Sequence, residues 1–170
     1  MNYSIRLAKK NELWLLKDIE EAAATLFTTT KYGLELQLDT LSNEILEKQQ
    51  KENCVWLALD EKNKAVAFAV VLIINNFAHL HEISVDPKYG RKGIGTKIIQ
   101  TIMFWAKATK LKGLTLSTFR DIPWNAPFYK KLGFREMKDE EISQELQNIR
   151  NDEKINGLPL NERLMMVLPF

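Results

Sequence analysis

The 170-residue sequence contains a single cysteine, Cys54, which excludes an intramolecular disulfide and is typical of a reducing compartment. Its longest apolar run, residues 65–74, is too short to span a lipid bilayer. Residues 1–6 lack the apolar segment of a secretory signal peptide. We therefore expect a cytoplasmic protein with no membrane partner.

The sequence also lacks a strong excess of either charge. It has 24 Lys and Arg against 22 Asp and Glu, for a formal net charge of +2 at pH 7. The basic residues are spread along the chain and form no stripe, so no nucleic-acid partner is expected. Internal repeats, linkers and low-complexity segments are also missing. A chain of this length that is 45% hydrophobic can bury one sizeable core, so we expect a single domain over residues 1–170.

Hydrophobic periodicity predicts a series of strands and helices. The expected strands cover residues 3–7, 55–59, 66–74, 80–85, 114–119 and 163–168, with a further strand that starts at Phe134. The expected helices cover residues 11–27, 39–51 and 93–110, a short helix opened by Pro123, and an acidic helix that runs from Asp139 and ends at Gly157. Hairpin strands followed by β-α-β crossovers favour an α/β (α+β) fold, with a mixed sheet and helices on both faces.

The segment from Val85 to Lys97 (Val-Asp-Pro-Lys-Tyr-Gly-Arg-Lys-Gly-Ile-Gly-Thr-Lys) joins an expected strand to an expected helix. Its glycines let backbone N–H groups approach a phosphate closely. The first turn of the helix offers further unpaired N–H donors and the positive end of the helix dipole. Arg91 and Lys92 add positive charge beside the glycines. This arrangement predicts a binding site for a phosphorylated ligand.

Two common phosphate-binding motifs do not fit this segment. A Walker loop needs Gly-Lys followed by Ser or Thr, whereas Gly95 is followed by Thr96 and Lys97. A dinucleotide fingerprint needs Gly-x-Gly-x-x-Gly, whereas the glycines here are Gly90, Gly93 and Gly95. An acidic residue about twenty positions further on, which would bind a ribose, is also missing.

A second segment, residues 125–134 (Asn-Ala-Pro-Phe-Tyr-Lys-Lys-Leu-Gly-Phe), follows downstream. Together with the glycine loop it resembles the GNAT superfamily of acetyl-CoA-dependent N-acyltransferases. The family's loop reads Gln/Arg-x-x-Gly-x-Gly/Ala. Gly93 and Gly95 fit this pattern, whereas Gly90 stands where Gln or Arg is usual and Arg91 follows it. The resemblance implies a mixed, mostly antiparallel sheet in which one parallel pair of strands splays apart, with acetyl-CoA as co-substrate and no metal.

The resemblance also implies which residues bind the cofactor. The pantetheine arm would lie between the splayed strands and pair with their backbone, so the side chains there need not be polar. The pyrophosphate would lie on the glycine loop. The implied cofactor-binding residues are Ser84 and Val85 on the strand, Arg91, Lys92, Gly93, Ile94, Gly95 and Thr96 on the loop, and Asn125 downstream.

Tyr129 is the implied catalytic acid. Acetyl transfer to an amine needs a base for the amine, polarisation of the thioester carbonyl and a proton for the leaving thiolate. In the family, a tyrosine at this place in the pattern Phe-Tyr-x-x-x-Gly-Phe protonates the thiolate, and Tyr129 matches that position. The alternative is a tyrosine that packs in the core with its hydroxyl at the rim.

The candidate bases precede the loop. His79 and His81 share one face of a strand, about 6–7 Å apart, and the reference pKa of histidine lies near neutral pH. This His-x-His spacing is similar to that of arylalkylamine N-acetyltransferases, in which the pair removes the proton. Glu82 points to the opposite face and is the second candidate. The alternatives are that the histidines are hydrogen-bonded structural residues and that Glu82 is a surface or ion-paired carboxylate.

The acceptor site is expected along residues 26–38. Phe27, Tyr32 and Trp124 offer aromatic surface and Glu35 a partner for an ammonium group, although the aromatic residues would also serve to pack helices. We expect an N-acetyltransferase that moves an acetyl group from acetyl-CoA to a primary amine, with a small-molecule amine favoured. A peptide or protein amine, and a non-catalytic acyl-CoA sensor, stay open as alternatives, as does a homodimer.

Overall fold

The computed structural model describes residues 2–33 and 40–170. The chain divides into two compact units: a first unit of Met1–Leu72 with His81–Phe104, and a second unit of Ile73–Leu80 with Trp105–Phe170. The single domain expected over residues 1–170 stays a prediction. Within the described ranges, no helix is both long enough and apolar enough to cross a membrane. The expected cytoplasmic location and the homodimer also stay predictions.

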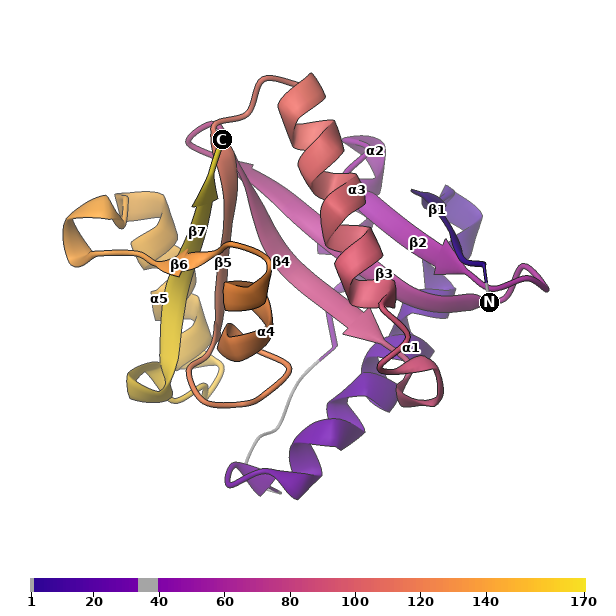
Figure 1. The fold of residues 1–170 in the computed structure, drawn as a ribbon, viewed down its shortest axis with the longest axis horizontal. Helices are drawn as coiled ribbons and strands as arrows, with labels where there is room; N and C mark the ends of the chain where they lie inside the picture. The colour runs from indigo at the N-terminus through magenta and orange to yellow at the C-terminus, as the bar shows by residue number, and fades with distance from the viewer. Residues whose placement is uncertain (1, 34–39) are drawn as a thin grey trace. The chain divides into compact units, whose positions relative to one another are not determined.

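Among the described residues, seven strands form one sheet in the order β1-β2-β3-β4-β5-β7-β6 (Figure 1). The bounds are β1 Ser4–Leu7, β2 Val55–Leu59, β3 Ala65–Ile74, β4 Phe77–Val85, β5 Gly113–Phe119, β6 Arg135–Glu136 and β7 Arg163–Pro169. β4 and β5 run parallel. The pairs β1–β2, β2–β3, β5–β7 and β6–β7 are antiparallel. The predicted mixed, mostly antiparallel sheet is therefore confirmed.

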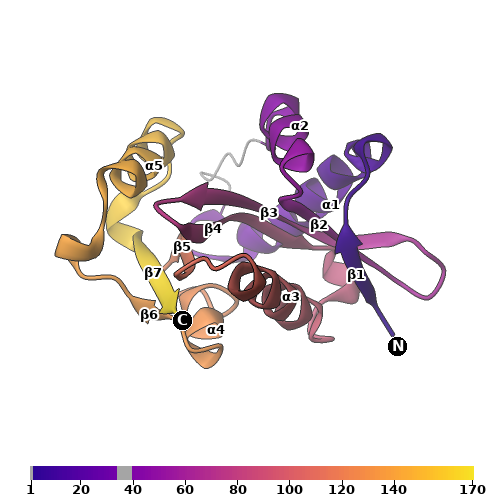
Figure 2. The same cartoon turned by 90° about the horizontal axis from the view of Figure 1, so that it is seen from above.

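Helices cover both faces of the strands in each unit. The bounds are α1 Trp14–Ala24, α2 Asn43–Lys51, α3 Ile94–Ala108, α4 Ala126–Lys131 and α5 Gln144–Ile155. In the first unit, α1 and α2 lie on one face of β2 and β3, and α3 begins on the other face (Figure 2). In the second unit, α4 and α5 lie on opposite sides of β7 (Figure 2). This arrangement confirms the predicted helices on both faces.

The core of the first unit forms because alternate strand residues face the same pair of helices. Val55, Leu57 and Leu59 of β2 share one face, and Phe68 and Val70 of β3 join them. The apolar stripe predicted for the first helix packs on this surface. The complete buried cluster consists of Ala8, Leu13, Leu16, Ile19, Leu46, Val55, Leu57, Leu59, Phe68 and Val70.

A tight turn explains why β4 begins three residues earlier than the predicted start at residue 80. Asn75 and Asn76 both have positive φ, 51° and 64°, and they join β3 directly to Phe77. Such a two-residue turn matches the twist of paired strands, and asparagine tolerates its backbone conformation. Residues 78–80 then pair with residues 114–116 of β5. The splay predicted beyond these residues stays a prediction.

The first two helices are shorter than predicted. α1 is flanked by Lys10–Glu12 and Thr25–Thr29, which form tighter 3-10 turns and so shorten the α-helix at both ends. α2 begins after Ser42, whose hydroxyl accepts the N–H of Ile45 at 3.3 Å. That bond caps the helix N-terminus. The predicted start at Asp39 lies outside the described residues.

Two later helices also begin elsewhere. Pro127, rather than Pro123, occupies the first turn of α4, where its missing N–H leaves no helical hydrogen bond unmade. α5 begins only after Ser143, because Asp139–Glu141 form a separate 3-10 turn. Gly157 follows the helix with a φ of 80° and ends it as predicted.

Candidate active site

The loop between β4 and α3 in the first unit has a backbone that suits phosphate binding (Figure 1). Gly93 has a φ of +77°, and no atom lies within 4 Å of the position that a Cβ would occupy. The N–H of Lys97 donates to the carbonyl of Gly93 at 3.0 Å, so Gly93 stands at the start of α3. First-turn N–H groups have no partner within their helix. Here the first turn consists of the predicted residues Ile94, Gly95 and Thr96.

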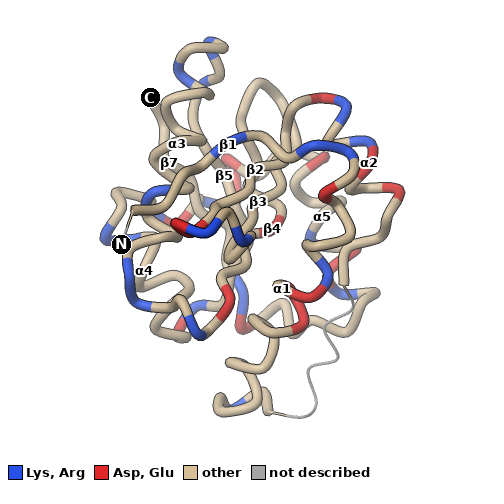
Figure 3. Tube along the Cα trace, turned by 90° about the vertical axis from the view of Figure 1, so that its right-hand side faces the viewer, with Lys and Arg blue, Asp and Glu red and all other residues tan. Residues whose placement is uncertain are grey.

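Gly90 and Arg91, where the loop departs from the family's pattern, differ in backbone conformation. Gly90 takes an ordinary extended conformation, with φ −60° and ψ 158°. Arg91 instead has a φ of 57°, in the left-handed region that favours glycine. Arg91 and Lys92 are both exposed, and Lys92 Nζ donates to the Lys88 carbonyl at 3.3 Å. The loop therefore presents two cations to solvent. Elsewhere in the described residues, basic and acidic residues are interspersed (Figure 3).

The end of β4 holds a hydrogen bond between neighbouring side chains. The Oγ of Ser84 donates to Oε1 of Glu82 at 2.7 Å, because residues two apart share one face of a strand. Ser84 is buried, and Val85 is half-buried. The backbone contacts predicted for Ser84 and Val85 with the pantetheine arm stay a prediction.

The sequence analysis missed Glu20 on α1. Both of its carboxylate oxygens lie 3.1 Å from the backbone nitrogen of Leu41, which donates to them. Burial raises the pKa of Glu20 to about 7, and the negative charge of Glu82 adds to the increase. One signal was available in the sequence: Glu20 lies four residues after the buried Leu16, so the helical period places it beside the apolar stripe.

Tyr129 belongs to the second unit, where α4 carries it. Its side chain is 6% exposed. Its ring meets Phe128 and Phe134 edge to face, with centroid distances of 5.2 Å and 5.7 Å. These contacts fix the plane of the phenol ring. The predicted role of Tyr129 as an acid stays a prediction.

Asn125 precedes α4 and has one buried atom whose hydrogen bonding is incomplete. Its Nδ2 donates to Oγ1 of Thr118 at 2.8 Å, and its backbone carbonyl accepts the N–H of Tyr129 at 3.1 Å. Its Oδ1 is buried and has no hydrogen-bond partner among the described residues. A buried acceptor without a donor is costly. An amide N–H of a pantetheine arm would satisfy it, so Asn125 fits the predicted cofactor contact.

His79 is buried in the second unit, with 1% of its surface exposed. Its Nδ1 lies 3.0 Å from Oγ1 of Thr115 on β5. His81, two residues further along β4, is half-buried. The contact of His79 is that of a hydrogen-bonded structural histidine, which was the stated alternative. The proton transfer predicted for the histidine pair stays a prediction.

The residues predicted for the acceptor site are only partly described. Glu35 lies outside the described residues. Phe27 and Tyr32 are half-buried, and Lys31 Nζ lies 5.1 Å from the centroid of the Tyr32 ring. Trp124 is 39% exposed. Their role toward an acceptor stays a prediction.

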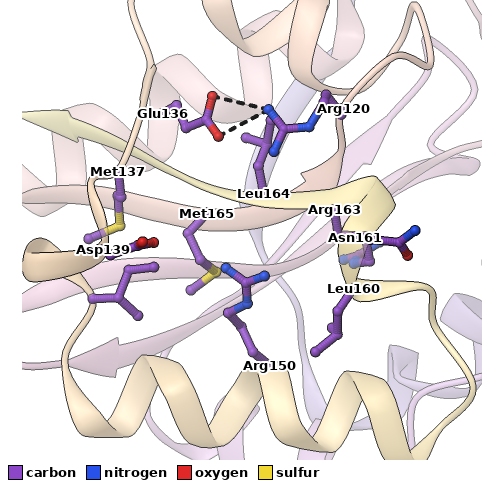
Figure 4. Close-up of a pocket in the computed structure, with 11 residues that line it drawn as sticks. Arg120, Glu136, Met137, Asp139, Arg150, Leu160, Asn161, Arg163, Leu164 and Met165 are labelled. Carbon is purple, nitrogen blue, oxygen red and sulfur yellow. Dashed lines mark hydrogen bonds and ion pairs between the residues drawn. The ribbon is translucent and has the colours of Figure 1, made fainter.

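A polar cavity of about 210 Å³ lies in the second unit (Figure 4). Arg120 lines it and donates to both carboxylate oxygens of Glu136, at 3.1 Å and 3.3 Å. None of the residues predicted for catalysis or cofactor binding lines this cavity. In residues 2–33 and 40–170, no group of three or more His, Cys, Asp or Glu side chains is arranged to hold a metal ion.

Comparison with known proteins decides the family. Residues 15–134 match the Acetyltransferase (GNAT) family. This chain belongs to the GNAT acetyltransferase family. The matched range includes the glycine loop, Glu82 and Tyr129. The predicted resemblance and the predicted acetyltransferase class are thereby confirmed.

Individual relatives of this GNAT acetyltransferase are distant. The [ribosomal protein bS18]-alanine N-acetyltransferase of Escherichia coli K12 is 25% identical over 120 residues, which cover 71% of this chain and 81% of the relative. The crystal structure of the Escherichia coli ribosomal-protein-S18-alanine N-acetyltransferase is 18% identical, with a TM-score of 0.69 over 99% of this chain and 94% of the other. The PaiA N-acetyltransferase of Thermoplasma acidophilum, solved with coenzyme A, is 16% identical, with a TM-score of 0.67 over 100% of both chains. At these identities, the structural likeness shows the fold.

Proposed function

We propose that this GNAT acetyltransferase moves the acetyl group of acetyl-CoA to a primary amine, by direct attack of the amine nitrogen on the thioester carbonyl. The family match over residues 15–134 carries the proposal. The open space at Gly93 and the buried Oδ1 of Asn125 support acetyl-CoA as the co-substrate. The coenzyme A bound to the PaiA enzyme also supports it.

Tyr129 protonates the departing thiolate in this proposal. A phenol has a reference pKa of about 10, close enough to that of an alkyl thiol to give up a proton as the C–S bond breaks. The packing of Phe128 and Phe134 around the ring supports this role, because a fixed ring holds its hydroxyl in one direction. An alkylamine also has a pKa of roughly 10, so the acceptor must lose a proton before it attacks. His79 with His81, or Glu82, receives that proton.

A small-molecule amine is the first acceptor class that we propose, and the α-amino group of a peptide is the second. The second is favoured by the Escherichia coli relative, which acts on an alanine of a ribosomal protein. The two classes are separated by measuring thiol release from acetyl-CoA with 2-phenylethylamine, with short alkylamines and with a hexapeptide that begins with alanine.

We expect turnover with at least one of these acceptors. Faster turnover with the small amines supports the first class, and faster turnover with the hexapeptide supports the second. Binding of acetyl-CoA without turnover on any acceptor would overturn the proposed transferase activity and favour a sensor. The matched control is the same hexapeptide with an acetylated N-terminus. It should not be turned over, because it lacks a free α-amino group.

A further inference from the structure

The polar cavity of the second unit takes no part in the function proposed above. Its lining residues come from the end of β5, from β6 and the segment that follows it, from α5, and from β7 with the turn before it (Figure 4). All of these belong to the second unit. The cavity volume of about 210 Å³ lies below the range of about 300–1,000 Å³ that pockets for drug-sized ligands occupy. A ligand of this cavity is therefore small.

Arg120 is the first of three arginines that line the cavity. Its Nη1 donates to both carboxylate oxygens of Glu136, at 3.1 Å and 3.3 Å, so the ion pair uses a single nitrogen of the guanidinium (Figure 4). A guanidinium carries five N–H donors. The charge of Arg120 is therefore balanced by Glu136, while its other nitrogens can still donate to a second acceptor.

Arg163 is the second arginine, and its neighbours fix the position of its guanidinium. Its Nη2 donates to Oε1 of Glu153 at 2.8 Å and to Oγ of Ser117 at 3.3 Å, and its Cζ lies 4.8 Å from the centroid of the Phe119 ring. Its Nε is buried and has no hydrogen-bond partner among the described residues. A buried donor without an acceptor is costly. A ligand that accepts this N–H would remove the cost.

Arg150 is the third arginine, and its charge is not balanced by a counterion. The side chain is half-buried, and its guanidinium makes no ion pair or hydrogen bond with the residues that the structure describes. Figure 4 shows it extending from α5 toward β7. Asp139 also lines the cavity, but it is exposed, so solvent and salt screen its charge. A half-buried arginine that lacks a counterion favours an anion that arrives from outside.

We propose that this cavity binds a small oxyanion, a carboxylate or a phosphate, through the guanidinium of Arg150 and the Nε–H of Arg163. Arginine suits such ligands because its N–H groups match the geometry of carboxylate and phosphate oxygens. The site is separate from the proposed acetyl transfer, since none of the residues predicted for catalysis or cofactor binding lines the cavity. The inference therefore does not depend on the proposed function.

Binding is tested with two probes, inorganic phosphate and succinate, at constant ionic strength. The ¹H–¹⁵N signal of the Arg163 Nε–H reports on the cavity itself, and isothermal titration calorimetry gives the dissociation constant. We expect saturable binding of at least one probe, with a change in the Arg163 signal. Tighter binding of succinate would identify the natural ligand as a carboxylate, and tighter binding of phosphate would identify it as a phosphate. Succinamide, the uncharged analogue of succinate, should not bind.

Arg150→Gln should weaken binding of the probe at least tenfold. Lys154→Gln is the matched control, because it removes the same charge from the same helix and Lys154 does not line the cavity. It should bind the probe with wild-type affinity. Circular dichroism checks that both variants are folded. Equal losses in the two variants would show a general attraction to the charge of α5 and would overturn the site.

A final titration separates this site from the glycine loop, which is also expected to attract phosphate. With the protein saturated with acetyl-CoA, the probe should still bind and still shift the Arg163 signal. Displacement of the probe by acetyl-CoA would assign the binding to the cofactor site and overturn the inference. So would an Arg163 signal that neither probe changes. Acetyl transfer without anion binding would leave the proposed function standing, and anion binding without acetyl transfer would leave this site standing.

Discussion

Tyr129 is a side chain in which packing and chemistry depend on different atoms. Its buried ring packs edge to face against Phe128 within α4 and against Phe134 just beyond the end of that helix. Its hydroxyl is the part that the proposed chemistry needs. Removal of the hydroxyl alone therefore separates the two contributions, since phenylalanine keeps the ring and its edge-to-face contacts.

We expect Tyr129→Phe to bind acetyl-CoA with wild-type affinity and to lower kcat by about a hundredfold, within the range for loss of a general acid. Calorimetric titration with CoA measures the affinity, and thiol release measures kcat. The thermal midpoint should stay close to wild type, because the buried ring is retained. A variant with wild-type kcat would reduce Tyr129 to a packing residue.

Single residues could be named as candidates from the sequence where a local pattern points to them. Tyr129 lies in a compact motif and Gly93 immediately precedes a helix, so both are candidates without a structure, and their roles stay predictions. Glu20 could not be named in this way, because the charge of Glu82, which helps to raise its pKa, comes from a distant part of the sequence. The burial that raises its pKa is likewise a property of the folded chain. For the same reason, the sequence could not tell that Thr115 would meet His79.

The bounds of strands and helices were predictable where one hydrophobic pattern dominated the segment. β2 was predicted with its observed bounds, because Val55–Leu59 is apolar throughout and a turn follows it. The start of β4 was missed, because the turn at Asn75 and Asn76 requires two left-handed residues that periodicity does not report. α4 was tied to the wrong proline, since Pro123 and Pro127 both fit a helix N-terminus by sequence and backbone geometry decides between them.

The loop from β4 to α3 yields a prediction about backbone conformation. Gly93→Val should weaken acetyl-CoA binding at least tenfold, because a side chain would enter the space left open for the pyrophosphate and strain a backbone with φ +77°. Equilibrium dialysis with radiolabelled acetyl-CoA measures the affinity. Circular dichroism checks that the variant is folded.

Gly157→Val is the matched control for that substitution. Gly157 has a φ of +80° and also has no atom within 4 Å of its Cβ position, so the backbone strain is nearly the same. It follows α5, far along the chain from the predicted cofactor residues. We expect a similar loss of stability in the two variants and a loss of affinity in Gly93→Val alone. Equal affinities in both would mean that the loop is an ordinary turn.

The fold class of the whole chain could be predicted because the order of elements limits the ways in which strands can be connected. The order of the sheet, with β7 between β5 and β6, could not be read from periodicity, which says nothing about neighbours. The stability of the chain is a second whole-molecule property that depends on tertiary contacts. The partly buried carboxylate of Glu20 gives stability a pH dependence with a definite sign.

Glu20 should make the protein less stable as the pH rises from about 4.5 to about 7. Its pKa is 4.5 when unperturbed and about 7 in the folded protein, so the folded state binds more protons across that window. Above pH 7 the charged, partly buried carboxylate lowers the free energy of unfolding by its full amount. We place that amount at about 1–2 kcal/mol after allowing for solvent screening. Glu20→Gln should therefore raise the free energy of unfolding at pH 8 by that amount and leave it nearly unchanged at pH 4.

Urea denaturation of Glu20→Gln, Glu21→Gln and the wild-type protein at several pH values measures this difference. Glu21→Gln should follow the wild-type curve, because the exposed Glu21 carboxylate lies beside Lys17. Parallel curves for Glu20→Gln and wild type across the whole pH range would contradict a raised pKa at Glu20.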